Sequence, residues 1–169
     1  MKPFNFGKWI EEHRDLLKPP VGNCQVFKDN DDFIVMVVGG PNSRKDFHYN
    51  EGEELFLQIE GDIILKVVED GIQKDILIQE GEMFLLPPKV PHSPQRPADS
   101  IGLVIERYRS SVEQDGFMWF CESCDNKLYE EYFVLEDIVA QLPGVMQTFY
   151  SNVGHRTCDK CGTVMQPPK

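Results

Sequence analysis

Three residues with metal-binding side chains, His48, Glu54 and His92, carry the clearest chemical signal in the chain. His48 and Glu54 lie on either side of a short turn in RKDFHYNEGEELFLQIEG, and His92 ends the stretch GEMFLLPPKVPH. Two imidazoles and one carboxylate on one face of a metal ion are the ligands of non-haem iron(II) oxygenases. The opposite face of the ion then stays open for substrate and dioxygen. These residue types therefore predict a catalytic iron(II) site.

A second set of metal-binding side chains consists of four cysteines in two CxxC pairs, Cys121 with Cys124 and Cys158 with Cys161. Each pair can form a tight turn that points two thiolates at one ion, and two such turns complete a tetrahedron. Zinc and iron both suit four thiolates, so the spacing leaves the metal open. Because no proposed chemical step requires this site, we predict a structural one that fastens the C-terminal segment to the rest of the domain; electron transfer and metal storage are the alternatives.

Composition limits the class of protein. The chain has 169 residues, which favours a single domain over residues 1–169. Its net charge of −11 argues against nucleic acid or an anionic membrane surface as a partner. It has no apolar run of about 18 residues, as a membrane span requires, and its first residues lack a signal sequence. Four of the five cysteines lie in CxxC pairs, which fits metal binding in a reducing compartment, so we expect a cytoplasmic protein.

The elements that must position these residues are mostly strands. Residues 5–18 predict a short helix, which Pro19 and Pro20 end. From about residue 22 to residue 110, short β-like runs alternate with turn residues, which indicates a sandwich or barrel. The runs are CQVF, DFIVMVVGG, ELFLQIEG, DIILKVVEDG, KDILIQEG, EMFLLPP and IGLVIER.

The run ELFLQIEG indicates a lined cavity. Strand alternation places Glu54, Phe56 and Gln58 on one face and the aliphatic residues between them on the other. Two polar side chains on the face of Phe56 are unusual for a dry core and typical of a cavity that holds a ligand.

The composition changes after the barrel. RSSVEQDG is predicted to be a loop, and residues 117–165 form the cysteine-bounded segment. Within it, residues 129–142 predict a helix that Pro143-Gly144 ends, with a second short helix near MQTFY.

Both metal-binding stretches resemble the motifs of the cupin superfamily, small β-barrels that hold a metal in the mouth. The resemblance rests on His48 and Glu54 before Gly61, and on GEMFLLPPKVPH with His92 at its end. The usual first motif has a second histidine where this chain has Asn50. The resemblance implies a mainly β, double-stranded β-helix (jelly-roll) barrel with a few short helices, with His, Glu and His as the metal ligands.

The sequence resembles one cupin family in particular, the 3-hydroxyanthranilate 3,4-dioxygenases, over essentially its whole length. The strings that carry this are LLKPPVGN, MVVGGPNSRKDFH, EELFLQIEGD, FLLPPKVPHSPQRP and LVIER. The family implies iron(II)-dependent extradiol cleavage of 3-hydroxyanthranilate by O2. The product, 2-amino-3-carboxymuconate semialdehyde, is the precursor of quinolinate in the kynurenine pathway to NAD. The family also implies a homodimer, and its longer microbial forms carry a rubredoxin-like iron centre at the four cysteines.

The family's substrate-contacting residues fall on Arg44, Arg96 and Glu106, and its iron ligands on the triad named above. Arg44, with His48 and Glu54, is expected around substrate and dioxygen at the iron. Each arginine lies four residues from one of the two histidines, and a guanidinium can clamp a carboxylate with two hydrogen bonds. Glu106 would hydrogen-bond the substrate and accept its phenolic proton; the alternative is an ordinary ion pair with a nearby arginine.

Two other functions fit parts of the pattern. One is a cupin oxygenase or isomerase with the same triad and another substrate, such as a different small acid. The two arginines weigh against a thiol or sugar substrate, which would not require them. The other is a non-catalytic metal-binding or sensor module with a zinc-ribbon tail. A nucleic-acid-binding ribbon would need basic residues around its cysteines, whereas Glu122, Asp125 and Glu130 surround the first pair.

Overall fold

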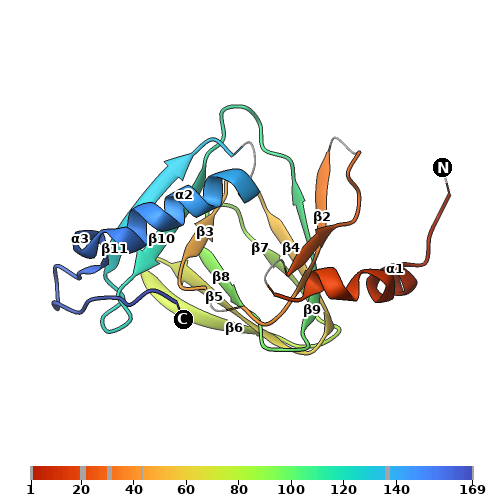
Figure 1. Ribbon diagram of the computed structural model, residues 1–169, viewed down its shortest axis with the longest axis horizontal. Helices are drawn as coiled ribbons and strands as arrows, with labels where there is room; N and C mark the ends of the chain where they lie inside the picture. The colour runs from red at the N-terminus through yellow and green to blue at the C-terminus, as the bar shows by residue number, and fades with distance from the viewer. Residues whose placement is uncertain (1, 20–21, 30–31, 43, 136–137, 169) are drawn as a thin grey trace.

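The computed structural model describes residues 2–19, 22–29, 32–42, 44–135 and 138–168, with the backbone alone for residues 138–140. Two antiparallel sheets face each other and form a cupin barrel, as the sequence predicts (Figure 1). The five-stranded sheet has the order β1 (Asn23–Gln25), β2 (Phe33–Gly39), β9 (Ile101–Arg107), β4 (Glu54–Glu60), β7 (Met83–Leu86). The six-stranded sheet has the order β11 (Lys127–Phe133), β10 (Asp115–Phe120), β3 (Phe47–Tyr49), β8 (His92–Gln95), β5 (Ile63–Glu69), β6 (Ile72–Ile78).

An apolar core fills part of the space between the sheets. Phe56 and Val104 of one sheet pack against Leu65 and Val67 of the other, and all four are buried. The alternation predicted for β4 is confirmed, because Glu54, Phe56 and Gln58 are all buried while the residues between them are half-buried. One face of β4 therefore supplies both apolar core and polar side chains.

The helix predicted at residues 5–18 is confirmed as α1 (Phe6–His13) followed by a 3₁₀ turn at Arg14–Leu17. The side chain of Asn5 caps α1 by accepting a hydrogen bond of 2.9 Å from a backbone N–H. Buried Ile10 packs against Val37, so α1 covers part of the outer face of the five-stranded sheet.

The helix predicted over residues 129–142 is wrong for residues 129–133 and correct for residues 138–142, while residues 136–137 lie outside the described residues. Lys127–Phe133 forms strand β11, which pairs with β10 in an antiparallel register from Asp115 to Phe120. The stretch KLYEEYF has alternating as well as helix-forming residues, and the hydrogen-bonding edge of β10 favours the strand. Pairing with a neighbouring strand thus outweighed local propensity.

A single helix, α2 (Ile138–Ser151), runs through Pro143 and Gly144 and includes the MQTFY segment. The prediction that Pro143-Gly144 ends a helix is therefore also wrong. Proline inside a helix removes one hydrogen bond, but Phe149 of α2 stacks on buried Trp119 of β10 at 4.2 Å between ring centroids. That packing offsets the lost bond.

All six residues of β10 are buried, and the strand lies between β11 and β3. A short helix, α3 (Val153–Arg156), follows α2 and precedes the last cysteine pair. Among the described residues, no helix combines the length and apolar character needed to cross a membrane.

Candidate metal centre and substrate pocket

The three predicted metal ligands come together inside the barrel. His48 is the middle residue of β3, Glu54 begins β4, and His92 begins β8. One donor atom from each lies within 4.8 Å of the others, and all three side chains are buried. Nε2 of His92 lies 3.1 Å from Oε2 of Glu54. Two histidines and a carboxylate at this separation fit a divalent transition metal with open positions.

The electrostatics of the triad also fit a cation. Burial is the largest effect on the pKa of Glu54 and raises it, but the charge and hydrogen bond of His92, together with the charges of His48 and Arg109, lower this pKa to about 2. Burial likewise disfavours the charged form of His92, yet Glu54 raises its pKa overall. Glu54 and His92 thus stabilise each other's charged forms, and a bound cation would take the place of a proton on His92.

A buried carboxylate that the sequence analysis did not single out, Asp115, orients one of these ligands. Nε2 of His48 lies 2.6 Å from Oδ2 of Asp115, which is fully buried at the start of β10. Arg109 donates two hydrogen bonds to the same carboxylate, from Nε and from Nη2, both at 2.9 Å. A histidine whose second nitrogen bonds a carboxylate is the usual arrangement around protein metal sites. Asp115 lay within the stretch predicted to be a loop, so its burial was not visible from the sequence.

Asn50 takes the position of the second histidine in the usual cupin motif. Its Nδ2 donates to Oε2 of Glu54 at 3.2 Å and to Oε2 of Glu106 at 3.4 Å. Glu106 lies directly opposite Glu54 in the β4–β9 register. Burial and then the negative charge of Glu54 raise the pKa of Glu106, against the opposing effect of Arg109. The predicted substrate-side carboxylate therefore lies beside the triad.

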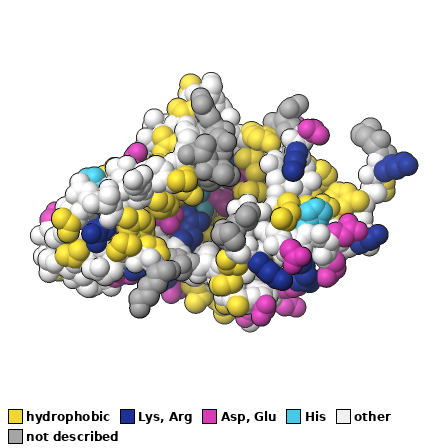
Figure 2. All heavy atoms as spheres, viewed as in Figure 1, with side chains coloured by type: hydrophobic (Ala, Val, Ile, Leu, Met, Phe, Trp, Pro, Cys, Tyr) yellow, Lys and Arg dark blue, Asp and Glu magenta, His cyan; other side chains and the backbone are white. Residues whose placement is uncertain are grey.

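Arg96 is a buried cation with an unused donor. Its side chain is 4% exposed, and its Nη1 has no hydrogen-bond partner. Burial, together with the nearby charge of Arg44, lowers the pKa of Arg96 to about 10. Arg44 is less buried and pairs with Asp46. An unpaired buried guanidinium is costly, so this site is suited to an anionic group that enters with a ligand. In the space-filling view, charged and histidine side chains are visible in a recess at the middle of the molecule (Figure 2).

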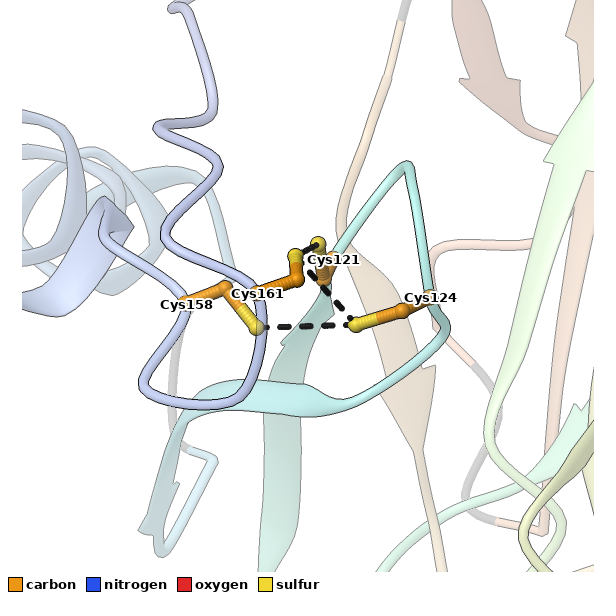
Figure 3. Close-up of side chains that lie close together, drawn as sticks. All are labelled: Cys121, Cys124, Cys158 and Cys161. Atoms are coloured by element: carbon orange, nitrogen blue, oxygen red, sulfur yellow. Dashed lines mark hydrogen bonds between the residues drawn. The ribbon is translucent and has the colours of Figure 1, made fainter.

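The four cysteines also form one cluster, as predicted (Figure 3). The Sγ atoms lie 3.5 Å apart for Cys121–Cys161 and Cys124–Cys161, and 3.6 Å apart for Cys124–Cys158. The edge of a tetrahedron with metal–sulfur bonds of about 2.3 Å is about 3.8 Å, so the cluster fits one ion. All four thiols are free of disulfides. His155 does not join them and stacks on Tyr129 at 4.2 Å.

The two cysteine turns share one backbone design. The carbonyl of Cys121 accepts a hydrogen bond from N–H of Asp125 at 3.0 Å, and that of Cys158 accepts one from Gly162 at 2.9 Å. Asp125 and Gly162 each follow the second cysteine of a pair, and both have a positive φ, 57° and 76°. Left-handed backbone at this point turns the chain back so that both thiols face the same side.

The fold and the donor atoms define the class of protein: a cupin with a two-histidine, one-carboxylate site and an added four-cysteine site. The chain belongs to the 3-hydroxyanthranilic acid dioxygenase family, whose model matches residues 1–150.

Curated relatives are similar over nearly the full length. A protein of Xanthomonas euvesicatoria pv. vesicatoria (strain 85-10) is 56% identical, with 99% of this chain and 94% of the relative covered. One of Ruegeria pomeroyi is 50% identical, with 100% and 96% covered. One of Shewanella woodyi is 49% identical, with 98% and 89% covered. All three are named 3-hydroxyanthranilate 3,4-dioxygenase.

Solved structures are more distant. A protein from Neisseria meningitidis has a TM-score of 0.49 at 19% identity, covering 63% of this chain and 100% of that one. A cupin-2 domain protein from Shewanella frigidimarina has a TM-score of 0.47 at 21% identity, covering 63% and 94%. Neither likeness adds to the argument from the fold itself.

Proposed function

We propose that this protein is a 3-hydroxyanthranilate 3,4-dioxygenase, which uses iron(II) and O2 to open the ring of 3-hydroxyanthranilate to 2-amino-3-carboxymuconate semialdehyde. The observation that carries the proposal is the buried, partly unpaired guanidinium of Arg96 within the electrostatic reach of the triad. The substrate has a carboxylate for that guanidinium and adjacent hydroxyl and amino groups for a metal. Relatives across the full length bear this name.

In this proposal His48, Glu54 and His92 hold the iron. When bound, iron(II) supplies the site at which the substrate's hydroxyl and amino groups and dioxygen meet and exchange electrons. Asp115 keeps the ring of His48 oriented, at 2.6 Å from Nε2. Asn50 stands at the position of the fourth ligand in the usual cupin motif but does not bind the ion. Its amide instead donates a hydrogen bond to Glu54 and holds that carboxylate in place.

Arg96 and Arg44 form the substrate clamp. Arg96 is buried and supplies a donor to the substrate carboxylate, and Arg44 adds a second positive charge from the more exposed side. Glu106 accepts the phenolic proton, because it lies beside the triad and its raised pKa makes it a better base than an ordinary glutamate. Binding, orientation and proton transfer are thereby assigned to separate residues.

The four cysteines hold a second iron or a zinc ion with a structural role. The chain is then a single cupin domain whose C-terminal segment is fastened by that ion, next to the apolar packing of α2 and Met165 against β10. Four thiolates require a reducing compartment, and for this reason we place the protein in the cytoplasm.

We further propose a homodimer that forms through the outer face of the five-stranded sheet. Met83 and Leu85 of β7 are 62% and 52% exposed there, beside half-buried Leu55 and Ile105. An exposed apolar patch on a sheet is typical of a protein interface. Leu85→Glu should yield monomers by light scattering, whereas a wild-type monomer would contradict the proposal.

The function is tested by anaerobic loading with ferrous iron, followed by 3-hydroxyanthranilate and air, with the absorbance of the semialdehyde as readout. Wild type should form product, and His48→Ala, Glu54→Ala and His92→Ala should not. His13→Ala is the matched control, because His13 stacks on Trp9 in α1, outside the site. Folded, iron-loaded wild type that makes no product would overturn the substrate assignment.

A further inference from the structure

Arg109 lies just beyond β9 and is the cation at the centre of a buried network. Its side chain is 11% exposed. Two of its nitrogens bond the two oxygens of Asp115, each at 2.9 Å. The same Nη2 also lies 2.8 Å from Oε2 of Glu106. One guanidinium therefore contacts two carboxylates on different strands, β10 and β9.

The two carboxylates act on different parts of the site. Asp115 is bonded to the ring of His48, on the metal side. Glu106 is the carboxylate on the substrate side, opposite Glu54 in the strand register. The network thus runs from His48 through Asp115 and Arg109 to Glu106. Among the described residues, no other arginine or lysine forms an ion pair with either carboxylate.

We propose that Arg109 is a positioning residue that fixes the ring of His48, through Asp115, and the carboxylate of Glu106 in one geometry. This rests on the function proposed above and assigns it a residue that touches neither metal nor substrate. The planar fork of arginine can bond both oxygens of Asp115 and still reach Glu106, which the single ammonium of lysine cannot do. Without Arg109, Asp115 would keep only its bond to His48 and Glu106 only that to Asn50, so neither buried carboxylate would retain its guanidinium partner.

The test compares Arg109→Lys, Arg109→Met and Asp115→Asn with Arg107→Met. Arg107 is the matched control, because it is two residues away and bonds Glu113 at the surface, 45% exposed. Cobalt(II) is titrated into each metal-free protein, and the absorption of the triad is isolated by subtracting the spectrum of His48→Ala. This subtraction removes the contribution of the four-cysteine site. Steady-state kcat and KM are then measured per bound iron.

For Arg109→Met and Asp115→Asn we expect cobalt affinity at the triad to fall at least about tenfold. The ligand-field spectrum of the bound cobalt should change. In Arg109→Met, kcat should fall by a much larger factor than the factor by which KM rises. Arg109→Lys should recover part of the affinity, and Arg107→Met should match wild type. A residue with a merely structural role would change stability but leave the spectrum unaltered.

The proposal is overturned if folded Arg109→Met has wild-type cobalt affinity, spectrum and kcat. If Arg109→Met does not fold, Asp115→Asn decides the matter alone, since an amide of the same shape should still lose affinity and alter the spectrum. Wild-type values for Asp115→Asn then overturn it. Failure of the proposed function would be distinguishable from failure of this proposal. In that case the wild-type protein itself would bind cobalt at the triad no better than His48→Ala does, or would make no product.

Discussion

His48 lies directly opposite His92 in the β3–β8 pair, with the two rings 5.3 Å apart. This pair brings two motifs that are far apart in the sequence to one point in the six-stranded sheet. Glu54 reaches the same point from the facing sheet. The metal site therefore depends on closure of the barrel as well as on the identity of the three side chains.

Metal binding at the triad should depend on pH. The pKa of Glu54 is lowered to about 2, so it is ionised at all ordinary pH values, whereas the pKa of His92 is raised, so it keeps a proton to a higher pH than an ordinary histidine does. A metal must displace that proton, so affinity should fall as pH is lowered through the pKa of His92. Calorimetry in buffers of different ionisation enthalpy measures the released proton. The His48→Ala variant measures the binding due to the cysteine site alone, which is subtracted. A metal affinity of the triad that stays constant between about pH 6 and pH 8 would contradict the prediction.

Gly102→Ala should weaken substrate binding. A Cβ at Gly102 would lie 2.7 Å from Oε1 of Gln58 and 2.9 Å from Nη1 of Arg96, so the guanidinium must shift. We expect KM to rise about tenfold, the loss typical of one weakened hydrogen bond to a charged group, with a smaller change in kcat. Gly144→Ala is the control, because its Cβ meets nothing within 4 Å in α2. Equal KM values for the two variants would refute this role of Gly102.

Removing the second metal should loosen the C-terminal segment. Cys161→Ser should lower the metal content by one equivalent and destabilise the packing of Trp119 on Phe149. A loss of about 2 kcal/mol would lower Tm by about 4–8 °C for a chain of this size. Differential scanning calorimetry and tryptophan fluorescence measure both effects. The control is Cys24→Ser, which changes a half-buried free cysteine in β1 and should retain both metals. An unchanged metal content in Cys161→Ser would contradict the four-thiolate site.

Glu106→Gln should remove the proton acceptor while leaving the shape of the pocket. We expect kcat to fall by about 10²- to 10⁴-fold, the range typical of general-base removal, with iron still bound. Because burial raises the pKa of Glu106, wild-type activity should decline on the acid side at a higher pH than an ordinary glutamate would give. Glu113→Gln, at a carboxylate that pairs with Arg107 outside the site, should keep the wild-type profile. A similar kcat in both variants would exclude Glu106 as the base.

The sequence allowed much of the site to be predicted, because its residues are tied to local spacing. His48, Glu54 and His92 lie in short motifs, and the alternation of β4 already placed Glu54 on an inward face. Asp115 could not be predicted in the same way. It follows turn-forming residues, and its burial arises from β10 pairing with strands on both sides, which local sequence does not encode.

The C-terminal errors have a related origin. In residues 127–133 a helix and a strand were both compatible with the local sequence, and the neighbouring β10 decided for the strand. In α2, Pro143 was a local signal for a helix end that the stacking of Phe149 on Trp119 outweighed. Contacts between segments that are distant in the sequence therefore account for both differences.

Strand β10 sets a fixed spacing between the two metal sites. Asp115, which bonds His48 of the triad, is its first residue, and Cys121 follows its last. Because successive strand residues face opposite sides, the insertion or deletion of one residue would turn either Asp115 or Cys121 away from its site. Substitutions within β10 can be tolerated where size and polarity are kept, but a change of length cannot. The six-residue length of β10 therefore couples the two sites, so that a change of length made for one site would disturb the other.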